Sequence, residues 1–127
     1  IKKLHPDAVI PTYGTPFAAG ADLYACMDSS VTIEPGQTQF IHTGLSVEIP
    51  VGFAGLVYAR SGLACKKGIA PANKVGVIDA DYRGEIESCE RIAQLVITPF
   101  LTAQFEETDE LGDTERGEGG FGSTGRK

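Results

Sequence analysis

Hydrophobic and polar positions follow one another in short runs that glycine and proline interrupt. Residues 40–49 alternate, with Phe40 and Leu45 among the apolar positions, and the run stops at Pro50. A period of two is typical of a strand that has one buried face. Apolar runs rich in valine and isoleucine predict further strands over residues 31–36, 54–59, 75–78 and 92–98.

A helical period is sustained at one place only, over residues 61–67. We expect Ser61 to be the N-cap of this helix and Gly68 to end it. The pattern as a whole predicts an all-β fold, a sandwich or jelly roll, with one short helix.

Composition limits the possible classes of protein. The 127 residues suffice for one domain, and 42% hydrophobic residues are enough for a real core. A formal charge of −6 argues against binding to a nucleic-acid backbone, and no apolar run approaches the roughly 20 residues that span a bilayer. Three cysteines form no zinc-like or disulfide pattern, which favours a reducing compartment. We expect a cytoplasmic protein, with a nuclear or organellar form left open.

The C-terminal segment differs from the rest of the chain. Residues 106–118 are dominated by acidic side chains, and glycines dominate residues 117–125. Little apolar surface is available there to offset the backbone entropy of ordering, about 1–2 kcal/mol per residue. We therefore predict a β domain over residues 1–105 and an acidic linker with a flexible, glycine-rich arm over residues 106–127.

Five segments combine residue types that suit the binding of an anionic ligand, although each taken alone also has a plain structural explanation. They are residues 19–25, 60–64, 76–85, 91–95 and 116–125. Arg60 at a helix start suits phosphate oxygens. Asp79 lies in a tight turn, where a carboxylate can deprotonate water. The glycine-rich segment lacks the lysine of a P-loop.

In this order the five segments resemble the five motifs of the trimeric dUTP diphosphatases (dUTPases). The resemblance implies a jelly roll that assembles as a homotrimer, with each active site built from all three chains. It also implies Mg²⁺ as cofactor and the hydrolysis of dUTP to dUMP and pyrophosphate, without nucleic acid or membrane as partner.

The resemblance assigns a role to each matching residue. Asp79 is the general base, Asp22 holds Mg²⁺ through water, and Tyr82 packs on the deoxyribose. The phosphate-side contacts are Arg60, Ser61, Gly62 and Gln94. The uracil pocket is formed by Asn73, Gly76, Val77 and Ile78. The arm supplies Arg116, Phe121, Gly122, Ser123 and Thr124, with Phe121 on the base and the others at the phosphates.

The chain departs from the family pattern between the third and fourth motifs. Gly84 is followed almost at once by Arg91, where the family carries a strand, a turn and a return strand. The family places this hairpin near the three-fold centre of the trimer. We expect the trimer to survive with a shorter core around Cys89.

Two other functions remain open from the sequence. A dCTP deaminase, or a bifunctional deaminase and diphosphatase, shares the fold but resembles an Arg-Ser-Ser signature, whereas this chain has Arg60, Ser61 and Gly62. The second is a non-catalytic regulatory protein with the same fold. The presence of Asp79 and Tyr82 argues against it, because a pure scaffold needs neither residue.

Overall fold

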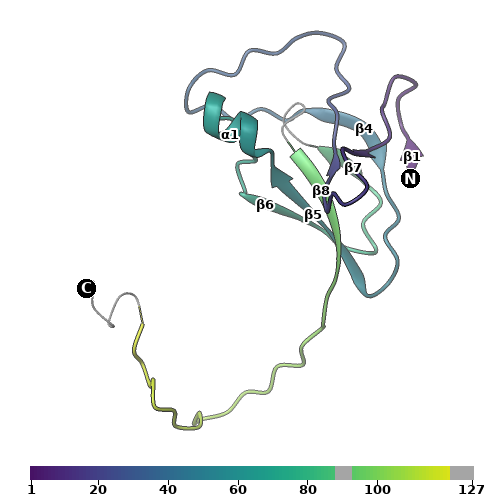
Figure 1. The fold of residues 1–127 in the computed structure, drawn as a ribbon. Helices are drawn as coiled ribbons and strands as arrows, with labels where there is room; N and C mark the ends of the chain where they lie inside the picture. Colours follow the sequence, from purple (N-terminus) through teal and green to yellow (C-terminus); the bar gives the residue numbers. More distant parts are fainter. Residues whose placement is uncertain (88–92, 121–127) are drawn as a thin grey trace.

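The computed structural model describes residues 1–87 and 93–120, which form two antiparallel sheets and one short helix (Figure 1). The first sheet has the order β1 (Lys2–Lys3), β4 (His42–Ser46) and β7 (Glu85–Glu87). The second has the order β2 (Thr12–Tyr13), β3 (Ala21–Asp22), β8 (Ala93–Pro99), β5 (Phe53–Ala59) and β6 (Val75–Ile78). The helix α1 (Ser61–Lys67) follows β5. The predicted all-β fold with one short helix is confirmed.

Strand β5 lies between β8 and the edge strand β6 in the second sheet. It pairs with β8 from Phe53↔Pro99 to Ala59↔Ala93 and with β6 on its other side. Gly55 permits a close approach here, because a Cβ at this position would lie 2.8 Å from Ile49 Cδ1. The core cluster combines both sheets and the segments between them: Leu23, Val47, Ile49, Val57, Ile78, Ile86, Ala93 and Leu95.

A β-bulge distorts the pairing of β4 with β7. His42 lies opposite Glu87 and Ser46 opposite Glu85, so the register shifts between them. Gly44 lies within the bulge with a φ of 66°, which favours glycine. Its missing side chain also matters for packing, since a Cβ would lie 2.9 Å from Ala8 Cβ.

Three of the expected strands are confirmed by the structure and one is wrong. Strands β5, β6 and β8 occupy residues 53–59, 75–78 and 93–99. Ile92, the first residue of the third expected strand, lies outside the described residues. Residues 31–36 form no strand, because no described strand lies beside them to complete a ladder. The turn at Gly36 is present, with the N–H of Gln37 donating to the carbonyl of Glu34 at 3.0 Å.

The alternation over residues 40–49 is only partly correct. The ladder covers His42–Ser46, and Leu45 is buried as expected. Phe40, however, is 76% exposed, while the neighbouring Ile41 is buried. Phe40 precedes the ladder, so no sheet partner fixes which way its side chain faces.

Helix α1 spans the predicted residues but has a different N-cap. Arg60 is the capping residue, with extended backbone and no capping hydrogen bond from its side chain, and Ser61 is already helical. The prediction that Ser61 is the N-cap is therefore wrong. Ser61 is the first helical residue, and the N-cap is the residue before it. Gly68 ends the helix in a left-handed conformation, as expected, and its N–H donates to Ala64.

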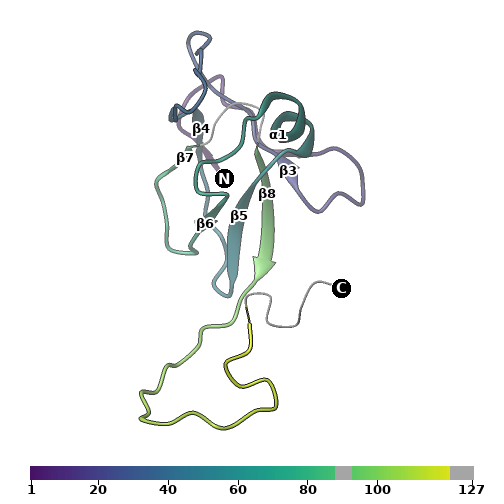
Figure 2. The same cartoon turned by 90° about the vertical axis from the view of Figure 1, so that its left-hand side faces the viewer.

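Residues 101–120 contain no helix or strand and run away from the two sheets beyond the end of β8 (Figure 2). Phe105 and Leu111 are 94% and 88% exposed. The division into residues 1–105 and 106–127 stays a prediction, and residues 88–92 and 121–127 lie outside the described part. Within the described part, no helix is long and apolar enough to cross a membrane.

The bulge yields a stability prediction. Gly44→Ala should lower the free energy of unfolding by about 2–4 kcal/mol, because it combines a left-handed φ with overpacking against Ala8. Gly14→Ala is the matched control, since a Cβ at Gly14 has no atom within 4 Å. Urea unfolding of both variants measures the difference, and equal stabilities would contradict the role of Gly44.

Candidate functional site

A hollow of about 430 Å³ lies beside β6, and it brings together one group of the predicted site residues. They are Asn73, Gly76, Val77, Ile78, Asp79 and Tyr82. We call this space the first hollow. Its opposite wall contains residues that the sequence did not single out, in the segments 38–41 and 85–87.

The turn before β6 fixes the position of Asn73 at the edge of the first hollow. Lys74 adopts a left-handed φ of 65°, its N–H donates to the carbonyl of Pro71, and the N–H of Val75 donates to the carbonyl of Asn73. Gly76 leaves space in the first hollow because it has no side chain. A Cβ at this position would lie 3.4 Å from both Asn73 Nδ2 and Val57 Cβ. A larger side chain at Gly76 would occupy the space in front of Asn73.

Strand β6 is the edge strand of its sheet. In an antiparallel ladder, alternate residues turn their N–H and C=O groups away from the neighbouring strand. Part of the backbone of residues 75–78 is therefore directed outward rather than into the pairing with β5. Such groups offer both donors and acceptors to a planar ligand.

A β-turn places Asp79 and Tyr82 at the end of β6. The N–H of Tyr82 donates to the carbonyl of Asp79 at 3.1 Å, and the hydroxyl of Tyr82 donates to the carbonyl of Glu85 at 3.0 Å. The aromatic ring lies across Gly84, where any Cβ would collide with it. Asp79 itself is exposed, so its carboxylate is accessible to a ligand and to water.

Arg83 and Ser46 hold this turn against the first sheet. Arg83 Nη1 donates to the carbonyls of Ala80 at 2.7 Å and Tyr82 at 2.9 Å. The hydroxyl of Ser46 donates to the carbonyl of Arg83 at 2.7 Å. The turn is thus connected to β4 as well as to β6.

Asp22, Arg60 and Gln94 form a second group of predicted residues. Asp22 lies opposite Gln94 in the β3–β8 pair, and Gln94 Nε2 donates to Asp22 Oδ1 at 3.4 Å. Arg60 Nε lies 3.4 Å from the same oxygen. Gly20 leaves room for Gln94, since a Cβ there would lie 3.1 Å from Gln94 Cβ.

Ser61 and Gly62 follow Arg60 directly in the first turn of α1. Both residues are exposed, and a Cβ at Gly62 would meet no atom within 4 Å. The start of the helix is therefore accessible next to the Asp22–Arg60 pair.

The two groups lie apart within one chain. Asp22, Gln94, Tyr58 and Val75 form a row across four adjacent strands. At about 4.8 Å per strand, Asp22 and Val75 are about 14 Å apart, and Asp79 lies beyond the far end of β6. Neither Asp22 nor Gln94 lines the first hollow.

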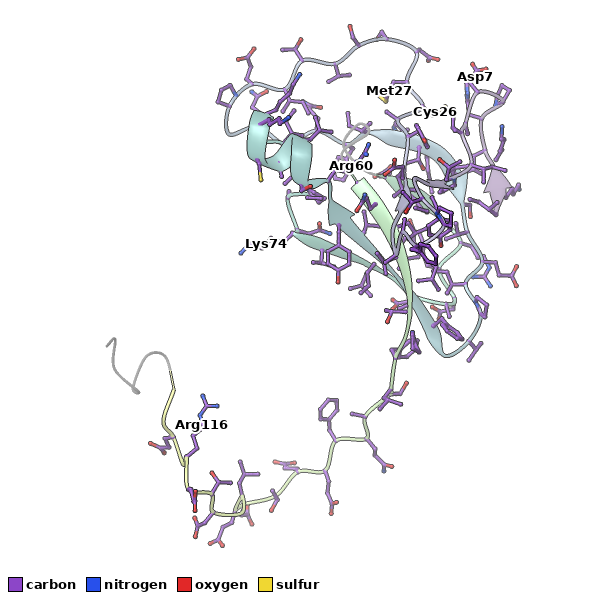
Figure 3. All side chains as sticks on the ribbon, viewed as in Figure 1. Asp7, Cys26, Met27, Arg60, Lys74 and Arg116 are labelled. Atoms are coloured by element: carbon purple, nitrogen blue, oxygen red, sulfur yellow. The ribbon has the colours of Figure 1, made fainter. Side chains whose placement is uncertain are left out.

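Arg116 lies on the extended segment, away from Arg60 and the two sheets (Figure 3). Its Nε donates to the carbonyl of Gly119 at 2.6 Å. The other predicted residues of the arm, Phe121, Gly122, Ser123 and Thr124, lie outside the described residues.

Glu85 is a site neighbour that sequence reasoning missed. Its Oε1 accepts the N–H of Gly44 at 2.7 Å, and its Oε2 lies 3.0 Å from His42 Nδ1. Partial burial raises the pKa of the Glu85 carboxyl, but these hydrogen bonds and the charge of His42 lower it by more, so the net shift is downward. Both partners of Glu85 are more than 40 positions away in the sequence. No pattern of neighbouring residues could therefore have indicated these contacts.

The Asp22 group fits a Mg²⁺ ion held through water. Mg²⁺ usually keeps several waters and binds one or two carboxylates together with substrate phosphates. Asp22 supplies a partly exposed carboxylate, and Arg60 beside it suits a phosphate.

Comparisons with known proteins identify the family of this chain. The dUTPase family model matches residues 6–125. The deoxyuridine 5'-triphosphate nucleotidohydrolase of Syntrophotalea carbinolica is 46% identical over 139 positions, covering 98% of this chain and 95% of its own length. That of Desulfitobacterium hafniense is 50% identical over 131 positions, covering 91% and 87%.

The fold agrees equally well with solved structures. The dUTPase of Staphylococcus bacteriophage 80alpha with dUPNHPP superposes with a TM-score of 0.86 at 29% identity, covering 98% of this chain and 96% of that chain. This confirms the predicted jelly-roll fold class.

The length of the first alignment bears on the departure from the family pattern. It spans 139 positions, more than the 127 residues of this chain, so the relative carries residues that this chain lacks. This agrees with a deletion, which the sequence places between Gly84 and Arg91. With the family model matched over nearly the whole chain and relatives at this level of identity, the chain belongs to the dUTPase family.

Proposed function

We propose that this protein hydrolyses dUTP to dUMP and pyrophosphate, which keeps uracil out of DNA and supplies dUMP for thymidylate synthesis. The observation that carries the proposal is the Asp79–Tyr82 turn at the end of an edge strand, beside a hollow of nucleoside size. The names of the relatives and the dUTP analogue in the phage enzyme support it.

Uracil is recognised at the edge of β6. The base presents an acceptor, a donor and an acceptor along its O4, N3–H and O2 edge. Outward backbone groups of residues 76–78, with the amide of Asn73, provide complementary partners. Cytosine reverses part of this pattern and would leave polar groups unpaired, while thymine adds a methyl group that crowds the pocket.

Asp79 acts as the general base. Its carboxylate takes a proton from a water molecule, whose oxygen forms the new bond to the α-phosphorus. The bond from that phosphorus to the bridging oxygen breaks, and pyrophosphate leaves. Such a reaction depends mainly on positioning and charge stabilisation.

The groups around Asp22 hold the phosphates. Arg60 and Gln94 donate hydrogen bonds to phosphate oxygens, with Ser61 and Gly62 at the accessible helix start. Asp22 would hold Mg²⁺ through water, and the ion would neutralise phosphate charge. The arm residues Arg116, Phe121, Gly122, Ser123 and Thr124 close over the base and the phosphates.

The separation of the two groups within one chain supports a homotrimer with shared sites. Asp79 and Asp22 would serve the same nucleotide from different subunits, because one chain holds them more than about 14 Å apart. The deleted hairpin shortens the connection near the predicted three-fold centre, and the proposal is that assembly tolerates this.

The catalytic role of Asp79 is tested by pyrophosphate release from dUTP, dTTP, dCTP and UTP, with and without Mg²⁺. Asp79→Asn should lower kcat for dUTP about 10²–10⁴-fold, because it removes the base. Asp81→Asn is the matched control and should retain most activity. Release of ammonia from dCTP would instead indicate a deaminase, and wild-type protein inactive on dUTP would overturn the proposal.

Tyr82 should control sugar selection. Tyr82→Ala opens space for a 2′-hydroxyl, so the ratio of kcat/KM for UTP to that for dUTP should rise about 10–100-fold. Tyr82→Phe keeps the ring and should keep the ratio near wild type. An unchanged ratio in the alanine variant would remove Tyr82 from sugar recognition.

Shared sites predict complementation between two inactive variants. Asp22→Ala and Asp79→Asn chains, mixed in equal amounts and reassembled, should recover about a quarter of wild-type activity, because random assembly places both intact residues at that share of sites. Light scattering should give three times the mass of the chain. A monomer mass at micromolar concentration, or no recovery on mixing, would contradict the trimer with shared sites.

A further inference from the structure

A second hollow, of about 400 Å³, lies beside β4 and is separate from the Asp22 group. Both histidines of the chain line it, together with Cys26, Asp28 and Glu85. Cys26 lies next to β4, with its N–H donating to the carbonyl of His42 at 2.7 Å (Figure 3). These are side chains that commonly bind metals, and the proposed hydrolysis uses none of them.

His42, Glu85 and Glu87 come together between the two hollows because of strand geometry. His42 lines the second hollow, Glu87 lines the first, and Glu85 lines both. Glu85 and Glu87 are two positions apart on β7, so their side chains project from the same face of the strand. His42 lies directly opposite Glu87 in the register. One ligand atom from each of the three residues lies within 4.8 Å of the others.

The spacing of these atoms is close to that around a bound ion. His42 Nδ1 lies 3.0 Å from Glu85 Oε2 and 3.8 Å from Glu87 Oε1. Ligands at about 2.0–2.2 Å from a metal ion are about 3.0–3.5 Å from one another. Small side-chain rotations would therefore bring all three atoms into one coordination shell.

The Glu85 carboxylate is also oriented by a partner outside the group. The N–H of Gly44, in the bulge, donates to its Oε1 at 2.7 Å and leaves Oε2 directed at His42. Metal-binding carboxylates are commonly held in this way by a further hydrogen bond. Two carboxylates so near each other also favour a cation between them.

We propose that His42, Glu85 and Glu87 bind a divalent transition-metal ion of the Zn²⁺ type and thereby cross-link β4 to β7. An imidazole nitrogen with two carboxylate oxygens suits such an ion better than Mg²⁺, which prefers oxygen ligands. This site differs from the proposed Mg²⁺ position at Asp22, and it does not depend on the proposed hydrolysis.

Isothermal titration of Zn²⁺ into the full-length, chelator-treated protein tests the site. The buffer contains excess Mg²⁺ and no nucleotide. We expect one Zn²⁺ per chain at micromolar or lower Kd, and a Tm rise of roughly 5–10 °C at a Zn²⁺ concentration of 100 times Kd. X-ray absorption of the loaded protein should show nitrogen and oxygen ligands without sulfur.

Matched variants locate the ion. His42→Gln and Glu87→Gln should each raise Kd at least 10-fold. His5→Gln is the control, since it removes the other histidine of the same hollow and should leave Kd unchanged. If His42→Gln fails to fold, Glu87→Gln still tests the site.

Three results would overturn the proposal. The first is the absence of saturable Zn²⁺ binding, which would leave the cluster as a contact between His42 and two glutamates without a metal. The second is an unchanged Kd in both glutamine variants. The third is a sulfur ligand, or loss of binding in Cys26→Ser and His5→Gln alone, which would assign the ion to those residues.

Discussion

The pairing of β5 with a strand on each side is the constraint on which the rest of the structure depends. One side of β5 holds β8, which brings Gln94 next to Asp22, and the other side holds β6, which carries the turn with Asp79. The same ladder that positions both groups also keeps them apart. In the proposed homotrimer, a nucleotide that contacts both groups would bind between copies of the chain.

Helices, strands and turns could be predicted from the sequence where residues close together in the chain determine the local structure. The helix over 61–67, the strand over 75–78 and the turn at Asp79 all depend on residues within a few positions. Pairing over long distances could not be predicted, so β7 and the contact of Glu85 with His42 were missed. Residues 31–36 alternate as a strand would, but alternation does not supply a partner.

The candidate site also combines a part that could be predicted from local sequence with a part that depends on long-range pairing. The segment from Asn73 to Tyr82 lies around one hollow, as the order of motifs suggested. The opposite wall consists of residues 38–41 and 85–87, which lie far apart in the sequence. The pairing of β4 with β7, which positions residues 85–87, changes register at the bulge around Gly44. Predicting that wall requires knowing which strands meet, and the bulge shifts the register by an amount that no local pattern reveals.

The position of β6 at the edge of its sheet has a consequence for solubility. An edge strand presents unpaired backbone groups that can join the edge of another molecule and begin aggregation. Val77 is 64% exposed on this strand and adds an apolar surface to the same edge. A base hydrogen-bonded along β6 would cover these groups, so the nucleotide would also protect the protein against unwanted strand addition.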